Sequence, residues 1–214
     1  DAYHLVLQGR HHWNWRTAES LAKAEACFLE AVRLDPGYAE AHGALALTYA
    51  VMQDHTDLPH SELGAKIEWA AESALRLNSD MPEAHAALGM YKMDRLDWAG
   101  AERALRRAID ANPGYATAHH WCSLILGYQG RIEEARREIE LAQSLDPLSL
   151  IVVTSVAWPD FYQRNYERAL KQLDRVRKLD PDFPVLHLAD GFICDAMGRF
   201  DEAAKSYRRL QSIN

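Results

Sequence analysis

Apolar residues recur at helical spacing along the chain, with polar residues between them. The segment 132–145 shows the pattern most clearly, because one face carries Ile132, Ala135, Ile139, Ala142 and Leu145. The opposite face carries Glu133, Glu134, Arg137, Glu138 and Glu140. This spacing predicts an amphipathic α-helix whose apolar face is buried against a neighbouring helix.

The helical pattern repeats with a period of 34 residues. Pro113, Pro147 and Pro181 are separated by this interval, and each follows an Asn or Asp that ends a helix. Residues twelve and five positions before each proline, and before Pro36, are small or β-branched: Ala24 and Ala31, Ala101 and Ala108, Ala135 and Ala142, Ala169 and Val176. Ala203 and Leu210 continue the spacing. Small residues at these positions allow two helices to approach within about 8–10 Å, and a proline cannot continue the second helix.

A 34-residue period with small residues seven apart resembles the tetratricopeptide repeat. The first-helix positions of that motif, a large residue followed by a small one, are occupied by Leu45-Ala46 with Tyr49, Leu88-Gly89, Cys122-Ser123 with Leu126, and Gly191. The resemblance implies an all-α, right-handed superhelical solenoid of six antiparallel helix pairs. We expect one array over residues 1–214, with repeats at about 2–38, 39–81, 82–115, 116–149, 150–183 and 184–214.

Three places depart from the repeat. The second repeat carries extra residues at 54–64, where Pro59 and Gly64 suggest a longer loop, and the first carries about three extra residues near Arg16–Glu19. Pro159 lies inside the first helix of the fifth repeat and predicts a kink or a split near Trp158. These departures could be functional or tolerated decoration.

The array also resembles one bacterial subgroup of these repeats. Its marks are Ala2-Tyr3, Gly9-Arg10, Trp13-Asn14, Arg16-Thr17, Leu34-Asp35-Pro36, Asn112-Pro113-Gly114-Tyr115, Ala118-His119-His120-Trp121 and Leu145-Asp146-Pro147-Leu148-Ser149. Such segments are similar to the C-terminal regions of bacterial signalling and transcriptional regulators, where they follow winged-helix, adenylate-cyclase or serine/threonine-kinase modules. The resemblance implies a regulatory context. Because the chain begins at Asp1, we expect it to be part of a longer protein.

The resemblance also implies a concave groove lined by the first helix of each repeat. The positions carried over are Trp13, Met90, Met93, His120, Leu124, Tyr128, Thr154, Trp158, Phe161, Tyr162, Leu188 and Phe192. Chaperone-binding relatives use paired Lys, Arg and Asn side chains here, and that set is absent. Aromatic anchors suit an apolar peptide or an amphipathic helix. Two alternatives stay open: Trp158, Phe161 and Tyr162 pack around the Pro159 kink, and Met90 and Met93 fill the core.

Composition and charge narrow the partners. The 24 basic and 31 acidic residues give a formal charge of −7 with no basic cluster, which disfavours nucleic acid. The most apolar stretch, Leu148 to Trp158, is about half the length needed to cross a bilayer, so we expect no membrane insertion. Three distant cysteines without a CxxC pair indicate reduced thiols. A cytoplasmic location is favoured, and a periplasmic one fits a membrane-anchored regulator.

Histidines and acidic residues give no sign of an active site. His42, His85, His119 and His187 share position 4 of the repeat, which predicts a structural role in the repeat. His4 with His11 or His12 is a weak surface-metal alternative. No catalytic motif is present, so we expect a non-enzymatic protein-interaction module without cofactor or metal. The rival hypotheses are a self-association scaffold through Tyr207, Leu210 and Ile213, and a ligand-sensing module attached to an enzyme.

Overall fold

The computed structural model describes residues 1–213, and within them the chain forms fourteen helices and no strand. The predicted end of the sixth repeat, at Asn214, lies outside these residues. The chain divides into two compact units, residues 1–121 and 122–214, which are described separately.

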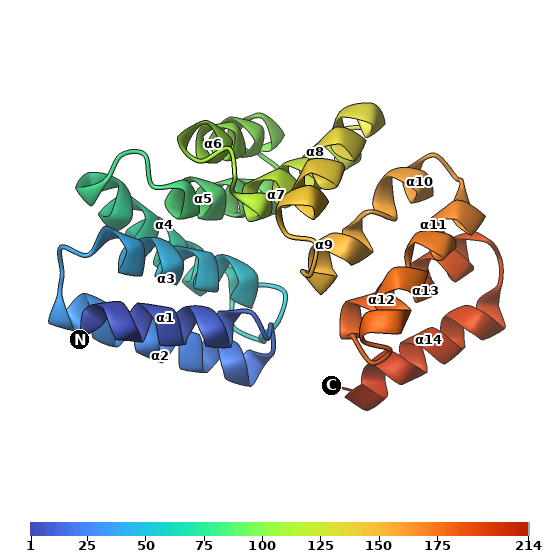
Figure 1. Cartoon of the computed structure of the whole chain (residues 1–214), viewed down its shortest axis with the longest axis horizontal. Helices are drawn as coiled ribbons and strands as arrows, with labels where there is room; N and C mark the ends of the chain where they lie inside the picture. Colours follow the sequence, from blue (N-terminus) through green and yellow to red (C-terminus); the bar gives the residue numbers. More distant parts are fainter. Residues whose placement is uncertain (214) are drawn as a thin grey trace. The chain divides into compact units, whose positions relative to one another are not determined.

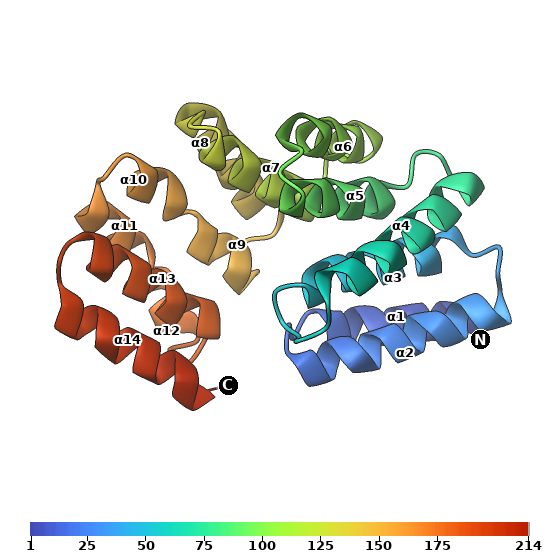
Figure 2. The ribbon, with the colours of Figure 1, turned by 180° about the vertical axis from the view of Figure 1, so that it is seen from behind.

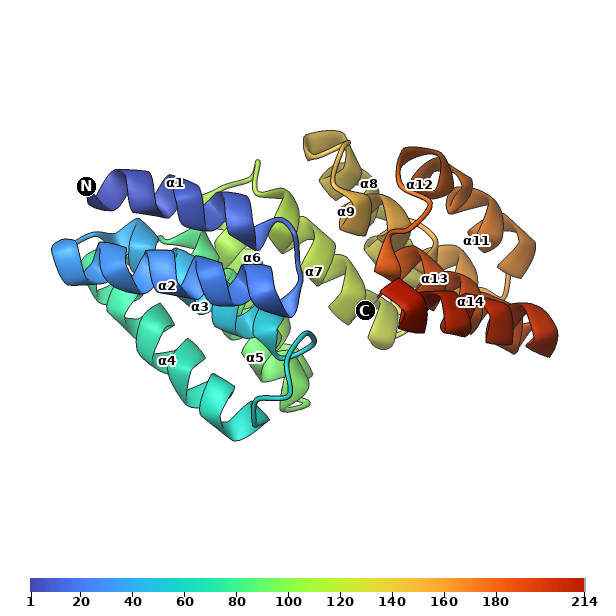
Figure 3. The same ribbon diagram turned by 90° about the horizontal axis from the view of Figure 1, so that it is seen from below.

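Unit 1 consists of helices that pair in chain order. They are α1 (Ala2–Trp13), α2 (Ala18–Leu34), α3 (Ala39–Met52), α4 (His60–Leu77), α5 (Pro82–Asp94), α6 (Trp98–Ala111) and the start of α7 (Ala116–Tyr128). α1 packs on α2, α3 on α4 and α5 on α6, and α3 also packs on α2 and α5 (Figures 1 and 3). Each pair is therefore covered by the next, as a repeat array requires.

The extra residues of the second repeat lengthen a helix as well as a loop. The connection between α3 and α4 runs from residue 53 to residue 59, and α4 has 18 residues where α6 has 14. The prediction of a loop over 54–64 is thus wrong for its last five residues. Gly64 lies inside α4, where its missing Cβ leaves room for the Tyr91 ring, 2.8 Å from the ideal Cβ position. The glycine indicated a close approach and not a turn.

Unit 2 contains the end of α7 and seven further helices. They are α8 (Ile132–Leu145), α9 (Leu150–Ser155), α10 (Trp158–Tyr162), α11 (Tyr166–Gln172), α12 (Asp174–Leu179), α13 (Pro184–Ala196) and α14 (Phe200–Ile213). α13 and α14 lie side by side in Figure 2 and pack together. The core includes Val153, Ala169, Leu173, Leu186 and Ile193, all essentially inaccessible to solvent.

Both helices of the fifth repeat are interrupted. The predicted split near Trp158 is confirmed, since α9 ends at Ser155 and Pro159 lies in the first turn of α10, where its missing N–H costs little. The second interruption, at Leu173 between α11 and α12, has no proline or glycine to mark it. Asp160 of α10 links the interrupted helices to their neighbours, because its buried carboxylate accepts a hydrogen bond from Arg136 of α8 at 2.9 Å and pairs with Arg168 of α11 at 3.2 Å.

Small residues hold the paired helices together. The alanines seven apart, Ala24 and Ala31, Ala101 and Ala108, and Ala135 and Ala142, are at most 1% exposed. On the first helices, glycine leaves room for a large side chain of the second helix. A Cβ at Gly89 would lie 2.7 Å from Leu105, and one at Gly191 would overlap the ring of Tyr207. The predicted close approach is therefore present within the pairs.

The connections that lead into α3, α5, α7, α9 and α13 are each closed by a side chain. His42, His85, His119 and His187 each donate from Nε2 to the carbonyl six residues earlier, at 2.9–3.1 Å. The predicted structural role of these histidines is confirmed. The fifth repeat has Val153 at the corresponding position. There the equivalent carbonyl, that of Pro147, accepts instead from Arg175 of α12 at 2.9 Å.

Five of the six turns between paired helices contain a residue with a left-handed backbone, and the longer connection between α3 and α4 is the exception. Gly130 and Gly198 both have φ of 75°, as glycine adopts easily. Arg16, Leu96 and Arg164 take the corresponding place with φ of 55°, 62° and 61°. A left-handed backbone costs a residue with a side chain roughly 1–2 kcal/mol.

Replacing Gly191 by Ala should destabilise the chain by about 1–3 kcal/mol, because the new Cβ overlaps the Tyr207 ring. Helix propensity alone predicts the opposite sign. Thermal or urea unfolding measures the change. Gly43→Ala is the matched control, since its nearest contacts, Met81 at 3.1 Å and Glu83 at 3.2 Å, are longer than the 2.3 Å overlap with Tyr207 at Gly191. Equal stability of the two variants would contradict the overlap.

Replacing Leu96 by Gly should stabilise the chain by roughly 0.5–1 kcal/mol, because relief of the left-handed backbone exceeds the added freedom of the unfolded chain. The Leu96 side chain is 68% exposed and loses little burial. Ala99→Gly, in the first turn of α6, should instead lower stability by up to about 1 kcal/mol. Urea unfolding of both variants distinguishes backbone strain from a general effect of glycine.

Candidate binding surfaces

Seven aromatic rings of unit 2 form a continuous series of contacts, here called the aromatic run. Its members are Tyr128, Trp158, Phe161, Tyr162, Tyr166, Phe192 and Tyr207. Ring centroids of neighbours are 5.6–6.5 Å apart, within the range of favourable edge-to-face and tilted pairs. The rings come from α7, α10, α11, α13 and α14, so several helices support one surface.

Some rings of the aromatic run pack against the core of unit 2, and others are exposed to solvent. Trp158, Phe161 and Tyr166 pack against the core of unit 2. Tyr128 and Phe192 are 57% and 48% exposed. Gly127 leaves room for the Tyr162 ring, 2.6 Å from its ideal Cβ position. Burial, and then Tyr128, raise the pKa of Tyr162, so its phenol stays neutral.

The structure brings together five of the residues expected in the groove. Tyr128, Trp158, Phe161, Tyr162 and Phe192 all belong to the aromatic run. Trp158 and Phe161 also pack on the core, as the packing alternative expected. Their assignment to a binding surface stays a prediction.

Three other expected residues of unit 2 do not join these rings. Leu124 and Leu188 are half-buried. Thr154 is fully buried and its hydroxyl donates to the Leu150 carbonyl at 2.7 Å, so its assignment to an open groove is corrected to helix packing. Tyr166 and Tyr207 join the run without having been expected there. Gly191 was the available signal for Tyr207, because a glycine facing the second helix allows a ring to approach.

The expected groove residues of unit 1 lie in a different environment. Met90 is 8% exposed and belongs to the core, as its packing alternative expected, and Met93 is half-buried. Trp13 is half-buried under Arg16, whose guanidinium carbon lies 3.6 Å from the ring centroid. Nearby, Arg10 pairs with Glu83 of α5 at 3.3 Å. Trp13 is therefore bordered by charged groups, whereas Trp158 of unit 2 is bordered by aromatic rings.

Burial also changes ionisation in unit 1. His120 is 5% exposed, and burial followed by the charge of Arg16 lowers its pKa to about 3. Burial raises the pKa of the Tyr115 phenol and lowers that of Arg16 to about 10. At neutral pH, His120 and Tyr115 are neutral while Arg16 remains charged.

His120 should make the chain sensitive to acid. An unfolded histidine takes up a proton near pH 6.5, whereas folded His120 does so near pH 3. Between these values the unfolded state binds more protons, so stability is lost as the pH falls. His120→Gln should lose less stability than the native chain between pH 7 and pH 4, measured by urea unfolding. His4→Gln, at an exposed histidine, is the control and should follow the native chain.

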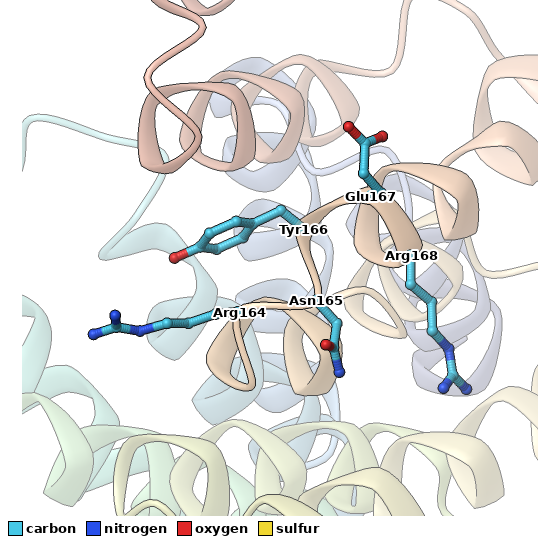
Figure 4. Close-up of a pocket in the computed structure, with 5 residues that line it drawn as sticks. All are labelled: Arg164, Asn165, Tyr166, Glu167 and Arg168. Atoms are coloured by element: carbon cyan, nitrogen blue, oxygen red, sulfur yellow. The ribbon is translucent and has the colours of Figure 1, made fainter.

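A shallow depression of about 450 Å³ lies at the turn between α10 and α11. It is lined by Arg164, Asn165, Tyr166, Glu167 and Arg168. Figure 4 shows Arg164 and Tyr166 projecting to one side and Glu167 away from them, so the side chains do not converge. Within residues 1–213, no group of three or more His, Cys, Asp or Glu side chains is placed to hold a metal ion. None of the described helices is both long enough and apolar enough to span a bilayer.

A family model for the tetratricopeptide repeat matches residues 86–149 and 160–213, more than half of the chain. The chain belongs to the tetratricopeptide-repeat family. Its predicted all-α solenoid fold is thereby confirmed, and the fold supports a role as a protein-interaction scaffold, a generally non-catalytic one. The tetratricopeptide repeats thus account for the period, the paired helices and the recurring glycines.

Known tetratricopeptide-repeat structures resemble this chain at low sequence identity. PilF of Pseudomonas aeruginosa is 16% identical, with 99% of this chain and 91% of that chain covered and a TM-score of 0.62. TTC0263 of Thermus thermophilus is 15% identical, with 92% of this chain and 99% of that chain covered and a TM-score of 0.70.

A sequence match extends to a regulatory protein. The transcriptional regulator HilA of Salmonella typhimurium is 22% identical over 99% of this chain. The chain spans 38% of the length of HilA.

Proposed function

We propose that this chain is a non-catalytic interaction module that binds an apolar protein segment on the aromatic run of unit 2. The observation that carries the proposal is the combination of anchored and exposed rings in one continuous series. Trp158 and Phe161 are held by the core, whereas Tyr128 and Phe192 present about half of their surface to solvent.

Rings that are already held in place lose little conformational entropy when a partner binds to them. Trp158 contacts Phe161, Tyr162 and Phe192, which restrict its motion before a partner arrives. A partner that covers exposed, already ordered rings gains burial without first immobilising them. Interface residues of this kind commonly contribute most of the binding energy.

The position of the rings suits a helical or extended segment. Tyr128, Trp158 and Phe192 come from α7, α10 and α13, the first helices of three successive repeats. An amphipathic helix presents apolar residues at i, i+3, i+4 and i+7, so one apolar face could contact several of these rings.

The wider role that we propose is in a bacterial regulatory protein. Support comes from the similarity to HilA, a transcriptional regulator, which extends over 99% of this chain. In that setting the repeats would dock a protein partner while the remaining part of the protein acts elsewhere.

The test compares removal of the two exposed rings of the aromatic run with removal of an exposed phenylalanine elsewhere in unit 2. The native chain, Tyr128→Ala/Phe192→Ala and Phe200→Ala are immobilised and exposed to lysate of the source organism, and captured proteins are identified by mass spectrometry. Phe200 is 67% exposed and serves as the matched control for exposed phenylalanine. A partner captured by the native chain and Phe200→Ala should be lost from the double variant. Its dissociation constant should rise by about 30-fold or more, corresponding to at least 2 kcal/mol.

Equal capture by the native chain and the double variant would contradict binding at the aromatic run. If no chain captures a partner, light scattering over a range of concentrations tests self-association, and a mass that increases with concentration would replace this proposal. Unfolding curves for each variant ensure that lost capture reflects the surface and not the fold.

A further inference from the structure

One end of unit 1 gathers two connections that are distant in sequence. The turn between α1 and α2 contains Arg16, and the longer loop between α3 and α4 contains Asp54 and His55. α1 packs on α3, and both connections lie at the same end of these helices (Figures 1 and 3). The longest departure from the repeat is thus placed beside Arg16, whose charge is felt by Asp54 and His55.

Arg16 is a half-buried cation that has no hydrogen-bond or ion-pair partner among residues 1–213. Its guanidinium stacks over Trp13. Asp54 influences Arg16 only beyond ion-pair distance. Stacking uses the face of the guanidinium and leaves its in-plane N–H donors available, and a planar guanidinium matches a carboxylate.

Trp13 adds a second unused donor at the same place. Its indole Nε1–H is buried and has no acceptor among the described residues. A buried donor without an acceptor costs about 1–3 kcal/mol. The neighbouring Tyr115 and His120 are neutral at physiological pH, so neither supplies an anion to Arg16.

We propose that Arg16, with the indole N–H of Trp13 as second donor, binds a carboxylate of a protein partner at this end of unit 1. Two kinds of donor, one of them cationic, favour an anionic acceptor, and a carboxylate offers two oxygens in the plane of the guanidinium. This site is in unit 1 and does not depend on binding at the aromatic run.

The left-handed backbone of Arg16 is a recurring feature of these turns, so another arginine in the same conformation can serve as a control. Arg164 takes the same left-handed place in the turn of the fifth repeat, with φ of 61° against 55° for Arg16. Arg164 lies in unit 2, where it projects on the same side as Tyr166 (Figure 4). Arg164→Gln therefore reproduces the charge change and the backbone geometry while leaving every residue of the proposed site unchanged.

The test follows the indole N–H signals of the six tryptophans in the ¹⁵N-labelled chain by NMR. The Trp13 signal is assigned with Trp13→Phe. Three probes are titrated: N-acetylglutamate α-amide, N-acetylglutamine α-amide and N-acetylalanine. We expect the Trp13 signal to move saturably with a carboxylate probe, with a dissociation constant on the order of millimolar, and to stay unchanged with the glutamine amide. Tighter binding of the glutamate amide assigns the carboxylate to an internal acidic side chain, and tighter binding of N-acetylalanine assigns it to a chain terminus.

Two variants of this site should change the carboxylate affinity in opposite directions. Arg16→Gln should weaken carboxylate binding by about tenfold or more, and Arg164→Gln should leave it unchanged. Asp54→Asn should strengthen it, because this removes a negative charge that repels the incoming carboxylate. The proposal is overturned if the glutamine amide moves the Trp13 signal equally, if Arg16→Gln binds like the native chain, or if neither carboxylate moves the signal. The other five indole signals report whether each variant is folded, and Arg16→Gly provides a second, unstrained replacement.

Discussion

The fit of a large side chain into the space left by a small one holds this structure together. Gly89 receives Leu105 and Gly191 receives Tyr207, and the alanines seven apart are equally inaccessible. Neither helix of a pair can bury its apolar face alone, so each pair depends on this contact and on the next pair. Because a protein interior is closely packed, a single added methyl group at such a place has no room.

The same constraint shapes the surface that a partner would meet. Tyr207 and Tyr162 approach the other rings because glycines at 191 and 127 admit them. In unit 1 the helix ends carry charge, and Trp13 is covered by a guanidinium rather than by further rings. One architecture thus carries two chemically different surfaces, and they are set by residues that the repeat leaves unspecified.

The sequence predicted what the period controls and missed what depends on tertiary contacts. Proline spacing located the pairs, the shared position of four histidines indicated their structural role, and Pro159 indicated the split between α9 and α10. The interruption at Leu173 has no local signal. Gly64 was read as a turn because its partner, Tyr91, is 27 residues away, and Thr154 was placed on a surface because register alone does not report burial.

The bond between Arg175 and the Pro147 carbonyl has a consequence for the order of folding. Four connections are closed by a histidine six residues away, so each can form as soon as its own first helix does. The connection before α9 waits for a donor 28 residues away on α12. Contacts between distant residues pay a larger loop-closure entropy and form later than local ones. We therefore expect the fifth repeat, with both of its helices interrupted, to complete its structure after its neighbours.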